Sequence, residues 1–288
     1  MVTLAQAGAR GGDRLAVRFT TDRPLLRAFL EGDRLFSAYA LCDLDDREFS
    51  RTRWGMALER EEPVAVVLEY AGVAPQPVFT LGEPDGVEAI LRELIRPRVA
   101  YMAMLQPAVV AVARQYRIDP GPAMVRMWVD RSTFRPHSGV TTRLLPSEIG
   151  DLNRLYDLGF TSWLPAGAIA EGVYYGVRVR GQLIAAAGTH VISREARMAV
   201  VGNVLTHQDY RGRGHAKTTT SAVTQELLRT CDQVVLNVRS DNPPAIAAYR
   251  ALGYQEHCRF EERLVHRRSG TWDGIMSPLR RLFPRKEP

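Results

Sequence analysis

Residues 201–228, VGNVLTHQDYRGRGHAKTTTSAVTQELL, are the stretch of sequence that decides the fold. An apolar run over residues 198–205 leads into this stretch and predicts a strand. A polar, glycine-rich turn follows, and the apolar residues beyond it recur at helical spacing, at Val223, Leu227 and Leu228. We therefore expect a strand, a tight turn and a helix in direct succession.

The turn itself, RGRGHA at residues 211–216, has the features of a phosphate-binding site. Glycine has no Cβ to keep a ligand away from the backbone. The first turn of a helix offers free N–H groups and a partial positive charge, and Arg211 and Arg213 add full charges. The pattern is neither the GxxxxGK[ST] of a P-loop nor the GxGxxG of a dinucleotide fold. The residues thus predict an anion site of another kind.

A second motif follows further along the chain. An apolar run at 234–238 predicts a strand, and after it comes the pattern N-x-x-A-x-x-x-Y-x-x-x-G-[FY], with fixed positions at Asn242, Ala245, Tyr249, Gly253 and Tyr254. Together with Arg-x-x-Gly-x-Ala at 211–216, this pattern resembles the GNAT superfamily of N-acetyltransferases. The resemblance covers about residues 139–267, a little under half of the chain.

The resemblance implies that acetyl-CoA is the cosubstrate and assigns residues to it. The turn would hold the pyrophosphate with Arg211, Gly212, Arg213, Gly214, His215 and Ala216. The pantetheine arm would pair, as an added strand does, with the backbone of Val204, Leu205 and Thr206.

Two further residues belong to the expected cofactor site. Gly202 would mark a β-bulge that separates this strand from its neighbour, although a plain strand glycine would also fit. Asn242 precedes Pro243 and is suited to cap a helix, and in the resemblance it also contacts the cofactor.

Tyr249 is the residue to which the resemblance assigns chemistry, namely protonation of the CoA thiolate as it leaves. It lies seven residues after Asn242, two helical turns, so both residues face the same side of one helix. A phenol with a pKa of about 10 keeps its proton at neutral pH and can donate it. The alternative is that Tyr249 only packs against the sheet.

The sequence does not single out a general base. The strand at 198–206 contains no acid, and Asn203 and His207 are its nearest polar candidates. Residues 256–261 near the last strand include Glu256, His257 and Glu261, and an amine can also lose its proton through ordered water. His190 and His266 have no metal-ligand partners at useful spacing, so no metal is expected.

Composition is that of a globular protein, with 45% hydrophobic and 24% charged residues in 288. No uncharged apolar run approaches the ~20 residues of a membrane span, and the first residues do not resemble a signal peptide. The three cysteines, Cys42, Cys231 and Cys258, are widely spaced, which favours reduced thiols and a cytoplasmic location. The net charge of +6 would suit an anionic cofactor, nucleic acid or no ligand.

Three segments are expected: an N-terminal α/β domain at 1–135, a GNAT acetyltransferase domain at 136–268 and a basic amphipathic tail at 269–288. The polar stretch at 130–139 is the predicted linker. The first half alternates strands and helices but lacks a phosphate turn, so it is either a degenerate, non-binding GNAT-like domain or an unrelated α+β domain. The tail would dock on the domain, bind a partner or contact a membrane surface.

The predicted fold is therefore α/β (α+β), a mixed and mostly antiparallel GNAT-type sheet flanked by helices and preceded by a second α/β domain. The predicted function is transfer of an acetyl group from acetyl-CoA to a primary amine, directly within a ternary complex. The alternative is a CoA-binding regulatory or scaffold protein without turnover. Nucleic acid is not an expected partner, because no RNA-binding or helix-turn-helix pattern accompanies the charge. A homodimer is compatible with the sequence.

Overall fold

The structure is a computed structural model that describes residues 15–157, 164–165 and 167–268, and the predicted tail at 269–288 lies outside this range. The strands of its first half are β1 (Ala16–Phe19), β2 (Thr52–Glu59), β3 (Glu62–Tyr70), β4 (Gln76–Gly82), β5 (Val99–Leu105), β6 (Tyr116–Ile118) and β7 (Met124–Val129). Those of its second half are β8 (Thr142–Arg143), β9 (Tyr175–Val179), β10 (Gln182–Ser193), β11 (Met198–Thr206), β12 (Gln233–Arg239) and β13 (Gln255–Arg267).

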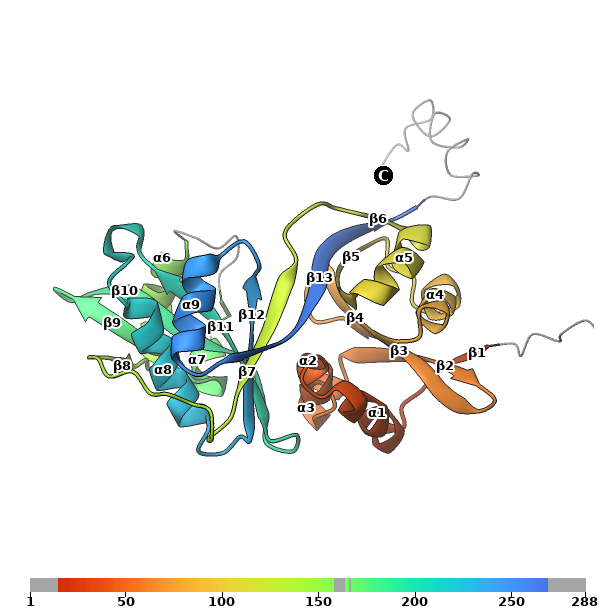
Figure 1. The fold of residues 1–288 in the computed structure, drawn as a ribbon, viewed down its shortest axis with the longest axis horizontal. Helices are drawn as coiled ribbons and strands as arrows, with labels where there is room; N and C mark the ends of the chain where they lie inside the picture. Colours follow the sequence, from red (N-terminus) through yellow and green to blue (C-terminus); the bar gives the residue numbers. More distant parts are fainter. Residues whose placement is uncertain (1–14, 158–163, 166, 269–288) are drawn as a thin grey trace, which may run out of the picture.

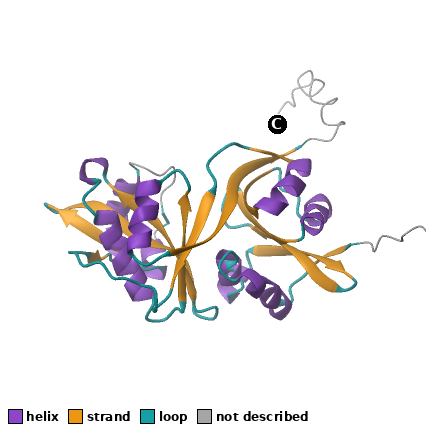
Figure 2. Ribbon diagram, in the orientation of Figure 1, coloured by secondary structure: helices purple, strands orange, loops and turns teal. Residues whose placement is uncertain are grey.

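The helices lie between groups of these strands along the chain, as the sequence predicts for a mixed α/β protein (Figure 2). In the first half they are α1 (Arg23–Leu30), α2 (Ala38–Cys42), α3 (Asp46–Phe49), α4 (Pro84–Glu93) and α5 (Gln106–Gln115). In the second half they are α6 (Ile149–Tyr156), α7 (Ala168–Glu171), α8 (His215–Leu227) and α9 (Pro243–Ala251).

All of the described strands join one continuous sheet in the order β1-β2-β3-β4-β5-β13-β7-β12-β11-β10-β9-β8, with β6 beside β13. Its pairs are antiparallel except β4–β5 and β11–β12, which confirms the predicted mixed, mostly antiparallel fold class. The two halves lie side by side, and β13 runs from one into the other (Figure 1).

Each half contributes a strand to the other. Strand β7 precedes the predicted linker, yet it pairs with β12 and β13 of the second half. Strand β13 in turn pairs with β7 over residues 255–260 and with β5 of the first half over residues 260–266. The sheet therefore crosses the proposed division between residues 135 and 136.

Helices cover the sheet on both faces. Helix α8 packs on β9, β10 and β11, and the opposite face of β10 and β11 is covered by α6 and by α2 of the first half. One hydrophobic core connects the halves, since Phe36 and Trp54 belong to the same buried cluster as Met198, Val235 and Phe260. The first half is thus part of the environment of the second.

Three elements are short or irregular at their ends. Helix α1 ends at Leu30, and the chain continues as a 3-10 turn over residues 31–33. Strand β8 has only two residues, because it is an edge strand whose flanks are exposed, Val140 at 89%. Helix α6 is preceded by a 3-10 turn over residues 146–148.

Within the described residues, no helix is both long and apolar enough to cross a membrane.

Candidate active site

A divergence of β11 from β12 forms the centre of the candidate site. The two strands pair in parallel from Met198 with Gln233 to Val201 with Leu236. Beyond this point β11 continues to Thr206 and pairs only with β10 among the described strands, while β12 stays with β7 as far as Arg239. The backbone of residues 202–206 therefore faces a gap where β12 would otherwise lie.

A β-bulge accompanies this divergence, one residue later than predicted. The register between β10 and β11 shifts by one residue between the pairs Gly188–Gly202 and Ala186–Leu205. Asn203 takes up the extra length with a left-handed φ of 52°. Gly202 is required for a different reason: a Cβ there would overlap the imidazole of His190.

The glycine turn follows β11 after a short 3-10 turn over residues 208–210. Gly212 and Gly214 have left-handed φ values of 76° and 82°, which favour glycine. Among the described residues, no atom lies within 4 Å of a Cβ built on either glycine, so the space beside the turn is open to a ligand. Gly214 is the N-cap of α8, and no side chain in the described chain caps the first N–H groups of this helix. These are the features of an anion site.

Two arginines and one threonine complete this end of the site. Arg211 donates from Nε to the carbonyl of Thr206 at 3.2 Å, and the guanidinium of Arg213 lies 5.4 Å from the ring centroid of Tyr210. The Oγ1 atom of Thr206 is buried and has no hydrogen-bond partner among the described residues. A buried hydroxyl without a partner is costly, so this atom is suited to a ligand that bonds to it.

Tyr249 and Asn242 come from α9, behind the divergent strands. Asn242 caps α9 by accepting a hydrogen bond from the amide of Ala245 at 3.3 Å, which confirms the predicted N-cap. Tyr249 is 7% exposed, its ring centroid lies 6.0 Å from that of Tyr254, and its hydroxyl makes no hydrogen bond within the described chain. Burial raises the pKa of Tyr249 to about 12, so the phenol remains protonated at neutral pH.

The opposite face of the sheet carries a polar cluster that sequence reasoning did not find. The hydroxyl of Tyr39, on α2, lies 2.5 Å from Nδ1 of His190, on β10. Nε2 of His190 lies 3.2 Å from Oδ1 of Asn203, whose amide nitrogen donates to the hydroxyl of Tyr174 at 3.0 Å. Only strand pairing brings His190 to Gly202, and only the contact between the halves adds Tyr39, so no local motif could indicate them.

The other acid–base candidates from the sequence have partners away from Gly202. His207 follows β11 and accepts from the amide of Asp209 at 3.3 Å, whereas Glu256 pairs with Arg250. His257 pairs with Asp33 and Glu261 with Arg263. His266, which the sequence offered only as a metal ligand, pairs with Asp119. Of the sequence candidates, only Asn203 lies at the divergence.

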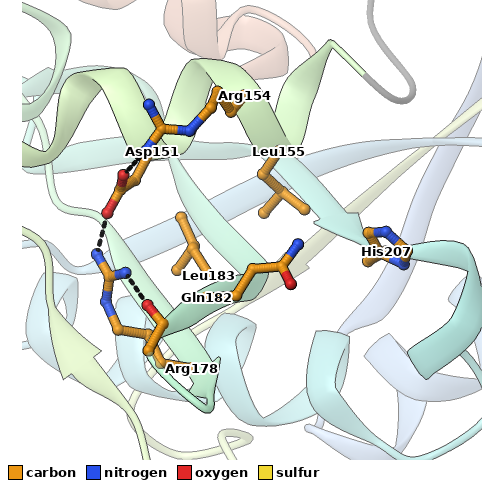
Figure 3. A pocket seen from close by; sticks show the side chains of 8 residues that line it. Asp151, Arg154, Leu155, Arg178, Gln182, Leu183 and His207 are labelled. Carbon is orange, nitrogen blue, oxygen red and sulfur yellow. Dashed lines mark hydrogen bonds and ion pairs between the residues drawn. The ribbon is translucent and has the colours of Figure 1, made fainter.

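A cavity of about 350 Å³ lies elsewhere, between α6 and the turn that joins β9 to β10 (Figure 3). Its charged side chains neutralise one another, because Arg178 pairs with Asp151 at 2.8 Å and with Glu148 at 2.6 Å. His207 lies at its edge, apart from these ion pairs. Neither Gly202 nor Tyr249 is among the residues that line this cavity.

Across the described parts of the chain, no group of three or more His, Cys, Asp or Glu side chains is arranged to hold a metal ion.

Comparison with known families agrees with the two sequence motifs. Residues 144–254 match the model of the Acetyltransferase (GNAT) family, so this part of the chain is a GNAT domain. A search of curated proteins found no match.

Solved structures that resemble the chain cover both halves. One is a tandem GNAT protein from the clavulanic acid biosynthesis pathway, at 16% identity and a TM-score of 0.56 over 90% of this chain and 100% of that one. Another is a GCN5-related N-acetyltransferase from Sphaerobacter thermophilus, at 16% identity and a TM-score of 0.59 over 89% and 96% of the two chains. A third, from Kribbella flavida, has 17% identity and a TM-score of 0.53 over 72% and 87%. At these identities the likeness shows a shared fold, the tandem GNAT fold included.

Proposed function

We propose that this GNAT domain transfers an acetyl group from acetyl-CoA to a primary amine, by direct attack within a ternary complex. One observation carries the proposal: the unpaired edge of β11 ends at an open glycine turn that begins a helix. A ligand with an extended arm and an anionic end fits such a surface. CoA has both parts.

The cofactor would lie along β11. Its pyrophosphate would accept hydrogen bonds from the turn at 211–216, with Arg211 and Arg213 adding charge. Its pantetheine amides would pair with the backbone of residues 204–206 on the side where β12 has diverged, and Thr206 Oγ1 would gain a partner. From Thr206 to Gly202 the strand spans about 13 Å at ~3.3 Å per residue. The thioester would thus lie beside Gly202, where β11 and β12 separate.

The reaction would then use both faces of the sheet. The amine nitrogen attacks the thioester carbonyl carbon, a C–N bond forms, and the C–S bond breaks. Tyr249, on the α9 side, donates its proton to the departing thiolate. Because its hydroxyl has no other partner within the described chain, the proton is not committed elsewhere.

The first half would bind no cofactor, because its corresponding junction is closed. Strand β4 leaves β5 after Phe79, but Thr80 donates from Oγ1 to the carbonyl of Ala103 at 3.2 Å across the gap. Helix α4 then begins with Glu83 at its N-cap and Pro84 after it. A carboxylate at this position repels phosphate, and proline removes an N–H donor. We therefore propose a degenerate GNAT-like half.

The second candidate is a CoA-binding protein without turnover, favoured by the absence of an acid on β11. Calorimetry with CoA, followed by a panel of amines with detection of released thiol, separates the two functions. The acetyltransferase proposal expects micromolar CoA binding and thiol release with at least one amine. Binding without release would support the second candidate, and no binding would contradict both.

A further inference from the structure

The structure assigns removal of the amine proton to Tyr39 of the first half, which passes its own proton to His190. This inference rests on the proposed acetyl transfer and deepens it, since it names the acid–base residues on the acceptor side. Neither residue belongs to the two sequence motifs.

The pair formed by Tyr39 and His190 lies beside Gly202, where the thioester of the bound cofactor is proposed to lie. The imidazole of His190 lies directly against Gly202, so closely that a Cβ there would overlap it. Gly202 is the first residue of β11 beyond its last pair with β12. Helix α2, which carries Tyr39, packs against β10 and β11 on the face opposite α8. The amine would therefore approach from one face while Tyr249 serves the thiolate from the other.

A chain of hydrogen bonds fixes the tautomer of His190. Tyr174 donates its hydroxyl proton to the carbonyl of Thr189 at 3.0 Å, so its oxygen must accept from Nδ2 of Asn203. Oδ1 of Asn203 then faces His190 and accepts from Nε2–H. Nδ1 of His190 is left without a proton and accepts from the hydroxyl of Tyr39.

This series of hydrogen bonds ends at the hydroxyl oxygen of Tyr39, which keeps a lone pair for an incoming N–H group. A second acceptor atom lies on the same side of the sheet. Asn237 shares a strand face with Val235, which packs in the cluster of Phe36, and its Oδ1 is buried without a partner among the described residues. Asn237 directly follows Leu236, the last β12 residue paired with β11. A primary amine, which has two N–H donors, matches two such acceptors.

The surroundings favour a concerted transfer over an isolated phenolate. Burial is the main cause of a raised pKa at Tyr39, and Glu262, Cys42 and Asp43 raise it further. The guanidinium of Arg126, 5.5 Å from the ring centroid of Tyr39, acts in the opposite direction. The phenol therefore gives up its proton only as it receives another.

His190 is in the correct state to receive that proton. Although part of its imidazole is open to solvent, the surrounding protein desolvates the ring and lowers its pKa, while the hydrogen bond to Asn203 acts in the opposite direction. The ring is therefore neutral at pH 7, with Nδ1 unprotonated.

Atoms and charges balance in this scheme. The amine proton moves to the oxygen of Tyr39 as the phenolic proton moves to Nδ1 of His190, which becomes imidazolium. Tyr249 gives its proton to the thiolate and becomes phenolate. Solvent then carries a proton from His190 back to Tyr249, and the products are an amide and the free thiol. Tyr39 is the catalytic group here, and His190 acts through it.

The test compares Tyr39→Phe and His190→Gln with Tyr101→Phe, a control on an exposed tyrosine of β5 in the same half. We expect kcat to fall by about 10²-fold in the first two and to stay unchanged in the control, with CoA affinity preserved in all three. The acid limb of the kcat profile should disappear in His190→Gln, because the titrating imidazole is gone. Circular dichroism confirms that each variant is folded.

Nitrogen-15 NMR of labelled protein provides a readout that does not depend on turnover. The wild type should show His190 protonated at Nε2, and the Nδ1 shift should change in Tyr39→Phe. Full activity of Tyr39→Phe in an active wild-type background, or an Nδ1-protonated ring, would overturn this inference alone. A wild type that binds CoA but acetylates no amine would overturn the acetyl transfer and, with it, this role for Tyr39.

Discussion

The imidazole of His190 occupies the space that a Cβ on Gly202 would need, so the two positions can hold only one side chain between them. Gly202→Ala should therefore push the ring away from Tyr39 and Asn203. We expect kcat to fall at least ~10-fold, since a general base works only within hydrogen-bond reach. Overpacking should also lower the free energy of unfolding by about 1–3 kcal/mol.

The matched control for this variant is Gly32→Ala. A Cβ at Gly32 has no atom within 4 Å in the described structure, so kcat should not change. Steady-state kinetics and urea denaturation of both variants check the prediction. A Gly202→Ala protein with wild-type kcat would show that the ring position does not matter for the reaction.

A negative charge at the glycine turn should weaken cofactor binding strongly. Gly214→Asp brings a carboxylate to the N-terminus of α8, where the pyrophosphate is expected, and should weaken CoA binding at least ~100-fold, about 2.7 kcal/mol. Gly181→Asp is the control for backbone strain, because Gly181 has a φ of 81° and is equally open. Calorimetry should show unchanged CoA affinity in Gly181→Asp. An equal loss of CoA affinity in the two variants would show that backbone strain, and not the charge, causes the effect.

Removal of the Tyr249 hydroxyl should affect the reaction and leave stability unchanged. The hydroxyl makes no hydrogen bond within the described chain, so Tyr249→Phe should have the melting temperature of the wild type. Its kcat should fall by about 10²-fold with CoA affinity preserved. Because burial raises the pKa of Tyr249 to about 12, the wild-type phenol should remain a competent acid up to about pH 10.

The control for Tyr249→Phe is Tyr254→Phe, whose hydroxyl lies 2.7 Å from Oγ1 of Thr224. That variant should lose stability and keep kcat. Thermal denaturation and initial rates at pH 7–10 measure both effects. An unchanged kcat in Tyr249→Phe would reduce this tyrosine to a packing role.

Asp43 should make stability depend on pH. Burial raises the pKa of Asp43 from 3.8 to about 7, with Glu48 and Asp45 adding to the shift. The folded state therefore holds a proton that the unfolded state releases, and the contribution of Asp43 is complete below pH 4 and lost as pH rises through about 7. Asp43→Asn should remove this decline, so its stability advantage over the wild type should grow from pH 4 to pH 8. Urea denaturation across this range tests the difference, and parallel curves would contradict it.

A chain that begins at residue 136 should fail to fold. It lacks β7, which lies between β12 and β13, and it lacks the first-half side of the core that contains Val235 and Phe260. Circular dichroism should show loss of the sheet. The control is the full chain with its backbone cleaved at Val140, which is 89% exposed. It keeps all of the described strands, so the two pieces should remain assembled and bind CoA. A folded, CoA-binding fragment from residue 136 would refute this dependence.

The sequence by itself determined the local parts of this protein. The glycines of the turn, the cap at Asn242 and the spacing to Tyr249 are fixed by short-range backbone geometry, and the structure places each of them on the predicted element. The mixed sheet could also be predicted, because apolar periodicity and turn residues act over a few positions.

Tertiary structure alone decided the rest. Periodicity identifies strands but not their partners, so the exchange of β7 and β13 between the halves could not be read from the chain. The same limit concealed His190 and Tyr39, which are 151 residues apart and meet only because α2 packs on β10 and β11. The proposed acid–base pair needs a neighbour from each half, because Tyr39 of the first half meets His190 of the second only in the folded protein.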